Sequence, residues 1–88
     1  MDELVNLRKQ IDSLDDKLLK ILAERISVVK KIGKFKKKDS LPLLDKRRLN
    51  KMFKSILLKA TLLNLSETFV RKLFNFIHEH SLEIQKKE

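Results

Sequence analysis

The chain contains no cysteine, tryptophan or tyrosine, and only one glycine and one proline occur among its 88 residues. The lack of cysteine excludes disulfides, thiolate metal sites and thiol nucleophiles. A single glycine cannot build a glycine-rich phosphate loop, and so little glycine and proline leaves little material for the turns of a β-sheet. No apolar run approaches the roughly eighteen residues of a membrane span, and the opening Met-Asp-Glu lacks the cationic and apolar regions of a secretory signal. We therefore expect one all-α domain, residues 1–88, in a cytoplasmic protein.

Basic residues outnumber acidic residues by 21 to 12, which gives a net charge of +9. A positive field of this size attracts either nucleic acid or a small dianion. The composition does not favour nucleic acid, because only five basic residues are Arg and the five Phe sit at or near core spacings, which leaves no aromatic platform for bases. A basic helical nucleic-acid-binding module remains the alternative from another functional class.

The most regular pattern lies at the start of the chain, where residues 2–37 are predicted to form one long amphipathic helix. Its apolar stripe steps by three and four residues through Leu4, Leu7, Ile11, Leu14, Leu18, Ile21, Val28, Ile32 and Phe35. Arg25 occupies a position on this stripe, where a guanidinium is costly unless an anion meets it. Arg25 therefore sets the register of helix packing, pairs with a carboxylate from another element, or belongs to an anion-binding site.

The predicted first helix is too long for a small globule. At 1.5 Å per residue it would run roughly 50 Å, whereas a compact chain of this length has a diameter of roughly 30 Å. Because the apolar stripe continues along the whole helix, the overhanging part needs a cover, and a second copy of the same helix supplies one. The sequence thus predicts an interlocked homodimer.

The remainder of the chain is predicted to form a loop at 38–44 and two shorter helices, at about 45–63 and 66–86. Asp45 and Ser66 are suited to the beginnings of these helices, and an Asp45–Arg48 side-chain pair would fit one helix edge. Ser81 and Gln85 continue the apolar stripe of the last helix with uncharged polar groups. His78 and His80 lie on different helix faces, which argues against a metal site and predicts two surface histidines.

Several cations and hydrogen-bonding groups lie on or beside the apolar faces, without a nucleophile elbow or a carboxylate acid–base pair. They are Arg25, Lys36, Arg48, Ser81 and Gln85. Arg8 precedes Arg25 by seventeen residues, or roughly 25 Å along one helix. One small ligand can therefore touch both arginines only if Arg8 comes from the other protomer.

Motifs of one known family are spread over nearly the whole chain. Residues 7–15 are similar to L-R-x-x-I-D-x-L-D, residues 22–25 to L-x-x-R, residues 33–36 to G-K-x-K, residues 42–48 to P-x-x-D-x-x-R, and Ser81 with Gln85 to a terminal S-x-x-x-Q. Together these segments resemble the all-helical class of chorismate mutases, whose three-helix protomers interlock into a dimer with two equivalent active sites.

The resemblance implies the Claisen rearrangement of chorismate to prephenate, a step of the shikimate pathway toward Phe and Tyr, with no cofactor and no metal. It implies that Arg25 and the partner's Arg8 bind the two carboxylates of chorismate, with help from Arg48. Lys36 and Gln85 would contact the ether oxygen, while Asp45 and Ser81 line the pocket; the implied catalytic residues are Arg25, Lys36 and Gln85. A pericyclic reaction requires a bound reactive conformer and stabilised charge, but no nucleophile.

One position departs from the family pattern. The family usually reads D-x-x-R-E, with the Glu at the ring hydroxyl of chorismate, whereas Arg48 is followed here by Leu49. Leu49 either begins the apolar stripe of the second helix or marks a changed substrate or weakened activity. The alternatives on the same fold are an isochorismate pyruvate lyase, a 4-amino-4-deoxychorismate mutase and an impaired family member; Ser81 and Asp45 favour a mutase over the lyase.

Overall fold

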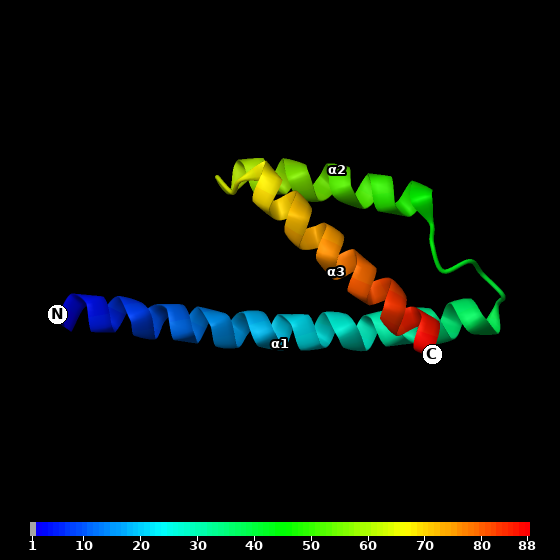
Figure 1. Cartoon of the computed structure of the whole chain (residues 1–88), viewed down its shortest axis with the longest axis horizontal. Helices are drawn as coiled ribbons and strands as arrows, with labels where there is room; N and C mark the ends of the chain where they lie inside the picture. Colours follow the sequence, from blue (N-terminus) through cyan, green and yellow to red (C-terminus); the bar gives the residue numbers. More distant parts are fainter. Residues whose placement is uncertain (1) are drawn as a thin grey trace.

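The computed structural model describes residues 2–88, which form three α-helices and no strand. The helices are α1 (Asp2–Lys38), α2 (Lys46–Leu62) and α3 (Glu67–Lys87). The predicted all-α fold with a long N-terminal helix is confirmed. In Figure 1, α2 runs in the opposite direction to α1 and at a distance from it, and α3 runs diagonally from the end of α2 to the C-terminal half of α1. Within residues 2–88, no helix combines the length and the apolar character that crossing a membrane requires.

In each interhelical connection, the second residue after the helix lies in the left-handed region. Ser40 has φ 54° and Asn64 has φ 58°. After α1, the N–H groups of Ser40 and Leu41 donate to the carbonyls of Lys37 and Lys36, and an equivalent pair of bonds closes α2 around Asn64. These are Schellman motifs, which satisfy the last carbonyls of a helix. The chain therefore reverses at both points without glycine, and Asn64 is a residue type that tolerates this conformation.

Side-chain caps begin the two shorter helices. The carboxylate of Asp45 accepts a 3.0 Å hydrogen bond from the backbone N–H of Arg48, and the hydroxyl of Ser66 accepts a 3.2 Å bond from that of Phe69. Each cap satisfies one of the otherwise unpaired N–H groups of the first turn. The expected Asp45–Arg48 side-chain pair is absent from the ion pairs of the described residues, since the Asp45 contact goes to the Arg48 backbone.

The crossing of α1 and α3 is centred on the only glycine of the chain. A Cβ atom at Gly33 would lie 2.8 Å from the Cα and 3.0 Å from the carbonyl oxygen of Gln85, closer than side chains pack in proteins. Gly33 thus allows the backbones of α1 and α3 to approach closely, so that neighbouring side chains of the two helices come into contact. α3 packs against both other helices, whereas α1 and α2 make no direct packing contact within residues 2–88.

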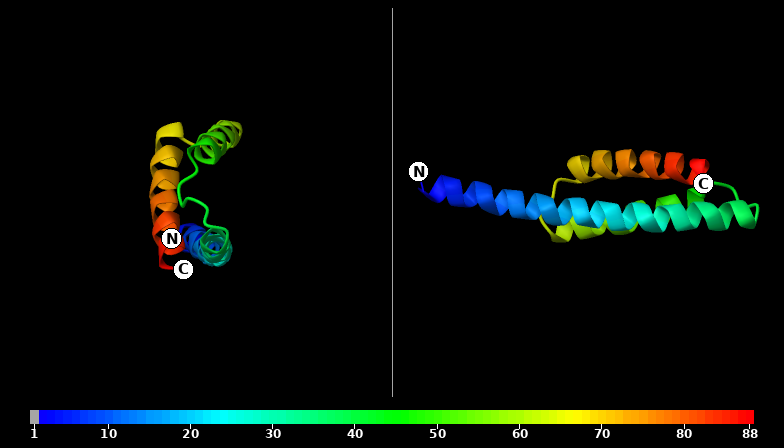
Figure 2. Two further views of the ribbon diagram at one scale, coloured as in Figure 1. Left: turned by 90° about the vertical axis from the view of Figure 1, so that its right-hand side faces the viewer. Right: turned by 90° about the horizontal axis from the view of Figure 1, so that it is seen from below.

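The described chain is elongated and leaves most of its large apolar side chains exposed. It measures 57 × 25 × 15 Å with a radius of gyration of 16.5 Å, against roughly 12 Å for a compact chain of this length. The N-terminal part of α1 extends beyond α2 and α3 in both views that show its length (Figures 1 and 2). Among the described apolar residues only Val29, Ala60 and Val70 are buried. One chain therefore lacks a core of ordinary size.

Candidate active site

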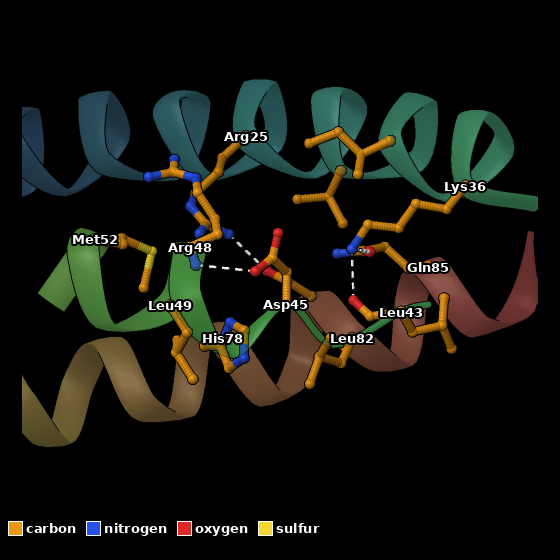
Figure 3. Close-up of a pocket in the computed structure, with 13 residues that line it drawn as sticks. Arg25, Lys36, Leu43, Asp45, Arg48, Leu49, Met52, His78, Leu82 and Gln85 are labelled. Atoms are coloured by element: carbon orange, nitrogen blue, oxygen red, sulfur yellow. Dashed lines mark hydrogen bonds between the residues drawn. The ribbon is translucent and has the colours of Figure 1, made fainter. Parts of the chain in front are cut away.

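A pocket of about 210 Å³ lies where all three helices converge, between α1 and α2 with α3 along its side (Figure 3). Its polar lining comprises Arg25, Lys36, Asp45, Arg48, His78, Ser81 and Gln85, and its apolar lining comprises Val29, Ile32, Leu43, Leu49, Met52 and Leu82. Polar side chains from distant parts of the sequence thus converge in one concave place. This combination is characteristic of small-molecule sites.

Arg25 is held at this pocket by α3. Its Nη1 donates a 2.6 Å hydrogen bond to the hydroxyl of Ser81, which in turn donates to the backbone carbonyl of Ile77 at 2.8 Å. Ser81 is buried, with 6% of its surface exposed, and Arg25 is partly buried. No carboxylate pairs with Arg25 within the described residues. The guanidinium is therefore oriented by one neutral contact and keeps most of its donors for an anion.

Lys36 occupies the other end of the pocket. Its ammonium group donates to Oε1 of Gln85 at 2.8 Å and to the backbone carbonyl of Leu43. Gln85 is 9% exposed and lies on the crossing at Gly33. The Lys36 charge is thus fixed by neutral acceptors from α3 and from the loop before α2, and its third N–H remains for a ligand.

The first turn of α2 forms a third wall. Because Asp45 caps this helix, Arg48 and Leu49 follow in the first turn, and both line the pocket. Arg48 is exposed and Leu49 is half-buried. Three basic side chains and one carboxylate line the pocket, so its net charge is +2 when His78 is neutral. Such a site complements a small dianion.

The chain matches the chorismate mutase type II family over residues 7–86. The chorismate mutase of Methanocaldococcus jannaschii is 31% identical over 87 residues, which are 99% of this chain and 88% of that protein. This chain belongs to the type II chorismate mutase family. Its activity is that of a chorismate mutase, an isomerase that converts chorismate to prephenate in aromatic amino acid biosynthesis.

Longer relatives carry a similar segment. The bifunctional chorismate mutase/prephenate dehydratase of Buchnera aphidicola subsp. Acyrthosiphon pisum is 33% identical over 86 residues, which are 98% of this chain but 22% of that protein. The bifunctional protein of the same name from Escherichia coli (strain K12) is 31% identical over 83 residues, 94% of this chain and 22% of that protein. The chain thus spans most of the Methanocaldococcus jannaschii relative and a small part of the bifunctional ones.

The structure of this type II chorismate mutase brings together six of the seven residues expected at its site. Arg25, Lys36, Asp45, Arg48, Ser81 and Gln85 all line the pocket. Arg8 does not, because it lies on the part of α1 that extends beyond the other helices. The expected origin of Arg8 in a second protomer stays a prediction.

His78 was not among the residues expected at the site. This histidine was expected on the surface, but it lines the pocket and is only partly exposed, whereas His80 is exposed as expected. Burial lowers the pKa of His78, and the positive charges of Arg25 and Lys36 lower it further, against a smaller opposing effect of Glu79. Its spacing from Ser81 and Gln85, three and seven residues, places all three on one helix face. That spacing was the available signal.

Proposed function

We propose that two copies of this chain interlock and that each of their two sites binds chorismate with residues of both chains. Arg25, Lys36, Arg48, Ser81 and Gln85 come from one protomer, and Arg8 comes from its partner. The observation that carries the proposal is the pair of contacts Arg25–Ser81 and Lys36–Gln85, which fix two cations about three helical turns apart in one pocket. Arg25 suits a carboxylate of the substrate, and Lys36 suits the ether oxygen.

The proposed chemistry uses positioning and electrostatics alone. Arg25, Arg48 and the partner's Arg8 bind the two carboxylates and so hold the enolpyruvyl group over the ring, in the conformer that reacts. As the C–O bond breaks, negative charge develops on the ether oxygen, where the Lys36 ammonium and the Gln85 amide donate hydrogen bonds. Because these donors are already oriented, they stabilise the transition state without reorganisation.

Three features of the chain support the dimer. α1 is 37 residues long and extends past the other helices. The apolar stripe on its N-terminal part has no cover within one chain: Ile11, Leu14 and Leu18 are each more than half exposed. An apolar hollow between α1 and α3, lined by Leu18, Leu22, Ile26, Leu73 and Phe76, is also open to solvent. A second copy would cover both surfaces.

The deciding experiment measures the disappearance of chorismate and identifies the product, with isochorismate and 4-amino-4-deoxychorismate assayed in parallel. Prephenate formation far above the uncatalysed rate, with chorismate preferred over the other two, is the expected result. Sedimentation of the same sample should give a dimer, since the proposed site needs Arg8 from a second chain. A folded protein that leaves chorismate unchanged, or that works as a monomer, would contradict the proposal.

A further inference from the structure

Asp45 and His78 are the polar lining side chains to which the proposed reaction has given no role, and Asp45 already caps α2. His78 has no such structural task. It projects from α3 and lines the pocket, which Leu49 of α2 also lines (Figure 3). Its Nε2 is buried and has no hydrogen-bond partner within the described residues. A shielded polar atom without a partner costs stability, so it calls for an explanation such as a ligand group that pairs with it.

The pocket is rich in donors and poor in acceptors. Arg25, Lys36 and Arg48 can only donate. The Ser81 hydroxyl donates to Ile77 and accepts from Arg25, while Oε1 of Gln85 and the Leu43 carbonyl both accept from Lys36. The carboxylates and the ether oxygen of chorismate match this excess of donors. The ring hydroxyl of chorismate also needs an acceptor for its proton, and Leu49 offers none.

Among the lining side chains, Asp45 and His78 have an acceptor atom that accepts no hydrogen bond within the described residues. One oxygen of Asp45 caps α2, and the residue is exposed, so water already solvates its second oxygen. A substrate hydroxyl would only replace that water, with little net gain. Nε2 of His78 is shielded from water, so a hydroxyl that reaches the imidazole supplies a bond that is otherwise unmade. The broad χ2 torsion of histidine allows either ring nitrogen to face the pocket.

We infer that His78 is a further substrate-binding residue of this site, whose neutral imidazole accepts a hydrogen bond from the ring hydroxyl of chorismate. The inference rests on the proposed function, because it concerns the same pocket and the same substrate. An imidazole is an acceptor only when it is unprotonated. The charged groups around His78 favour that state: Arg25 and Lys36 from α1 and Arg48 from α2 outnumber Asp45 of α2 and Glu79 of its own helix.

The first experiment is a thermodynamic cycle that compares removal of the ligand hydroxyl with replacement of His78. The probes are the bicyclic mimic of the transition state that carries the ring hydroxyl and the same mimic with hydrogen in its place, and the measurement is Kd. In the wild type, the hydroxyl should tighten binding about tenfold, the scale of one hydrogen bond to a shielded group. In His78→Leu the two mimics should bind within about twofold of each other, and His78→Gln, which keeps an acceptor, should retain most of the preference.

The outcomes separate this inference from the proposed function. If the wild type binds neither mimic, the proposed function fails and this inference fails with it. If the wild type binds both mimics but the hydroxyl contributes equally in His78→Leu, His78 merely packs against the pocket and the inference is overturned. Loss of the hydroxyl preference in Asp45→Asn, with the preference intact in His78→Leu, would assign the acceptor to Asp45 instead.

A pH profile provides a second readout that packing alone would not change. Because the pKa of His78 lies below its ordinary value of about 6.5, the imidazole is neutral at pH 7 and becomes protonated only as the pH falls through the lowered value. The kcat/KM for chorismate should therefore decline at acid pH in the wild type. The same decline is expected in the control His80→Gln, because the imidazole of His80 is exposed. His78→Gln should lack that decline, and identical profiles for the three proteins would contradict the inference.

Discussion

The ammonium group of Lys36 lies 2.8 Å from Oε1 of Gln85 and donates a hydrogen bond to it. Since the amide oxygen is taken by Lys36, the NH₂ group of Gln85 is left to donate. A residue of α1 and a residue of α3, forty-nine positions apart in the sequence, thereby act as one preorganised pair of donors. Substrate binding need not assemble this pair, since the fold already does so.

The Lys36 charge should matter more in the transition state than in the ground state. In Lys36→Met, which keeps the aliphatic stem, we expect a barrier higher by roughly 3 kcal/mol, seen mainly in kcat. Lys37→Met is the matched control, because Lys37 is exposed and donates only to the carbonyl of Glu88. A Lys36→Met enzyme with normal kcat and a raised KM would indicate that the residue merely attracts the dianion.

The shared site makes a prediction about mixed dimers. Arg8→Ala and Arg25→Ala chains should each be nearly inactive alone, because each homodimer lacks the same arginine in both sites. Mixed after unfolding and refolding, they should form heterodimers with one intact site and one site lacking both arginines, and activity should partly return. Heterodimers that form but remain inactive would refute a site built from two chains.

Gly33 should control both packing and catalysis. The Cβ of Gly33→Ala would meet the backbone of Gln85, which cannot rotate away. Overpacking of this kind costs about 1 to 3 kcal/mol, of which alanine's better helix propensity returns roughly 1 kcal/mol. We expect a modest fall in thermal stability and a larger fall in kcat/KM, because Gln85 moves away from Lys36. Ser27→Ala, an exposed change on the same helix, is the control. Equal activity in the two variants would show that the site tolerates a shifted α3.

Leu49 and His78 should be functionally coupled. A carboxylate at position 49 would be a new acceptor beside the pocket, and half-burial of Leu49 leaves room for its charge to remain hydrated. Leu49→Glu should therefore raise the kcat/KM of His78→Leu for chorismate by about tenfold, the value of one hydrogen bond, and change the wild type much less. Equal gains in both backgrounds, with thermal stability monitored in parallel, would show that the two residues act separately.

Local patterns in the sequence predicted the helices, and the family motifs implied six of the residues that line the pocket, but neither indicated His78. The three- and four-residue steps indicate the helices, and Asp45 and Ser66 occupy the caps that their chemistry favours. The burial of His78 at the pocket was not predicted, because it depends on which helices pack against α3 rather than on the residues next to His78 in the sequence. Ser40 was not recognisable as a left-handed residue, since serine carries no strong preference for that conformation.

The place of Arg8 also lies beyond what one chain can determine. Its helix is easily predicted, but its contacts depend on how a second α1 would pack along the first, and the apolar stripe allows several registers. Arg25 differs, because Ser81 reaches it from the same chain. Six of the expected residues thus converge through the packing of one chain, whereas nothing within residues 2–88 brings Arg8 to the pocket.

The close approach at Gly33 gives the pocket one stiff end and one adjustable end. Gln85 lies at that contact, so tilting α3 about it would hardly move the Lys36–Gln85 pair, whereas Ser81, one turn toward the N-terminus of α3, would shift relative to Arg25. The crossing would then act as a pivot next to the proposed donors Lys36 and Gln85. On this model, ligands that differ in the reach of their carboxylates are accommodated by a shift of Ser81 relative to Arg25, while Lys36 and Gln85 keep their orientation.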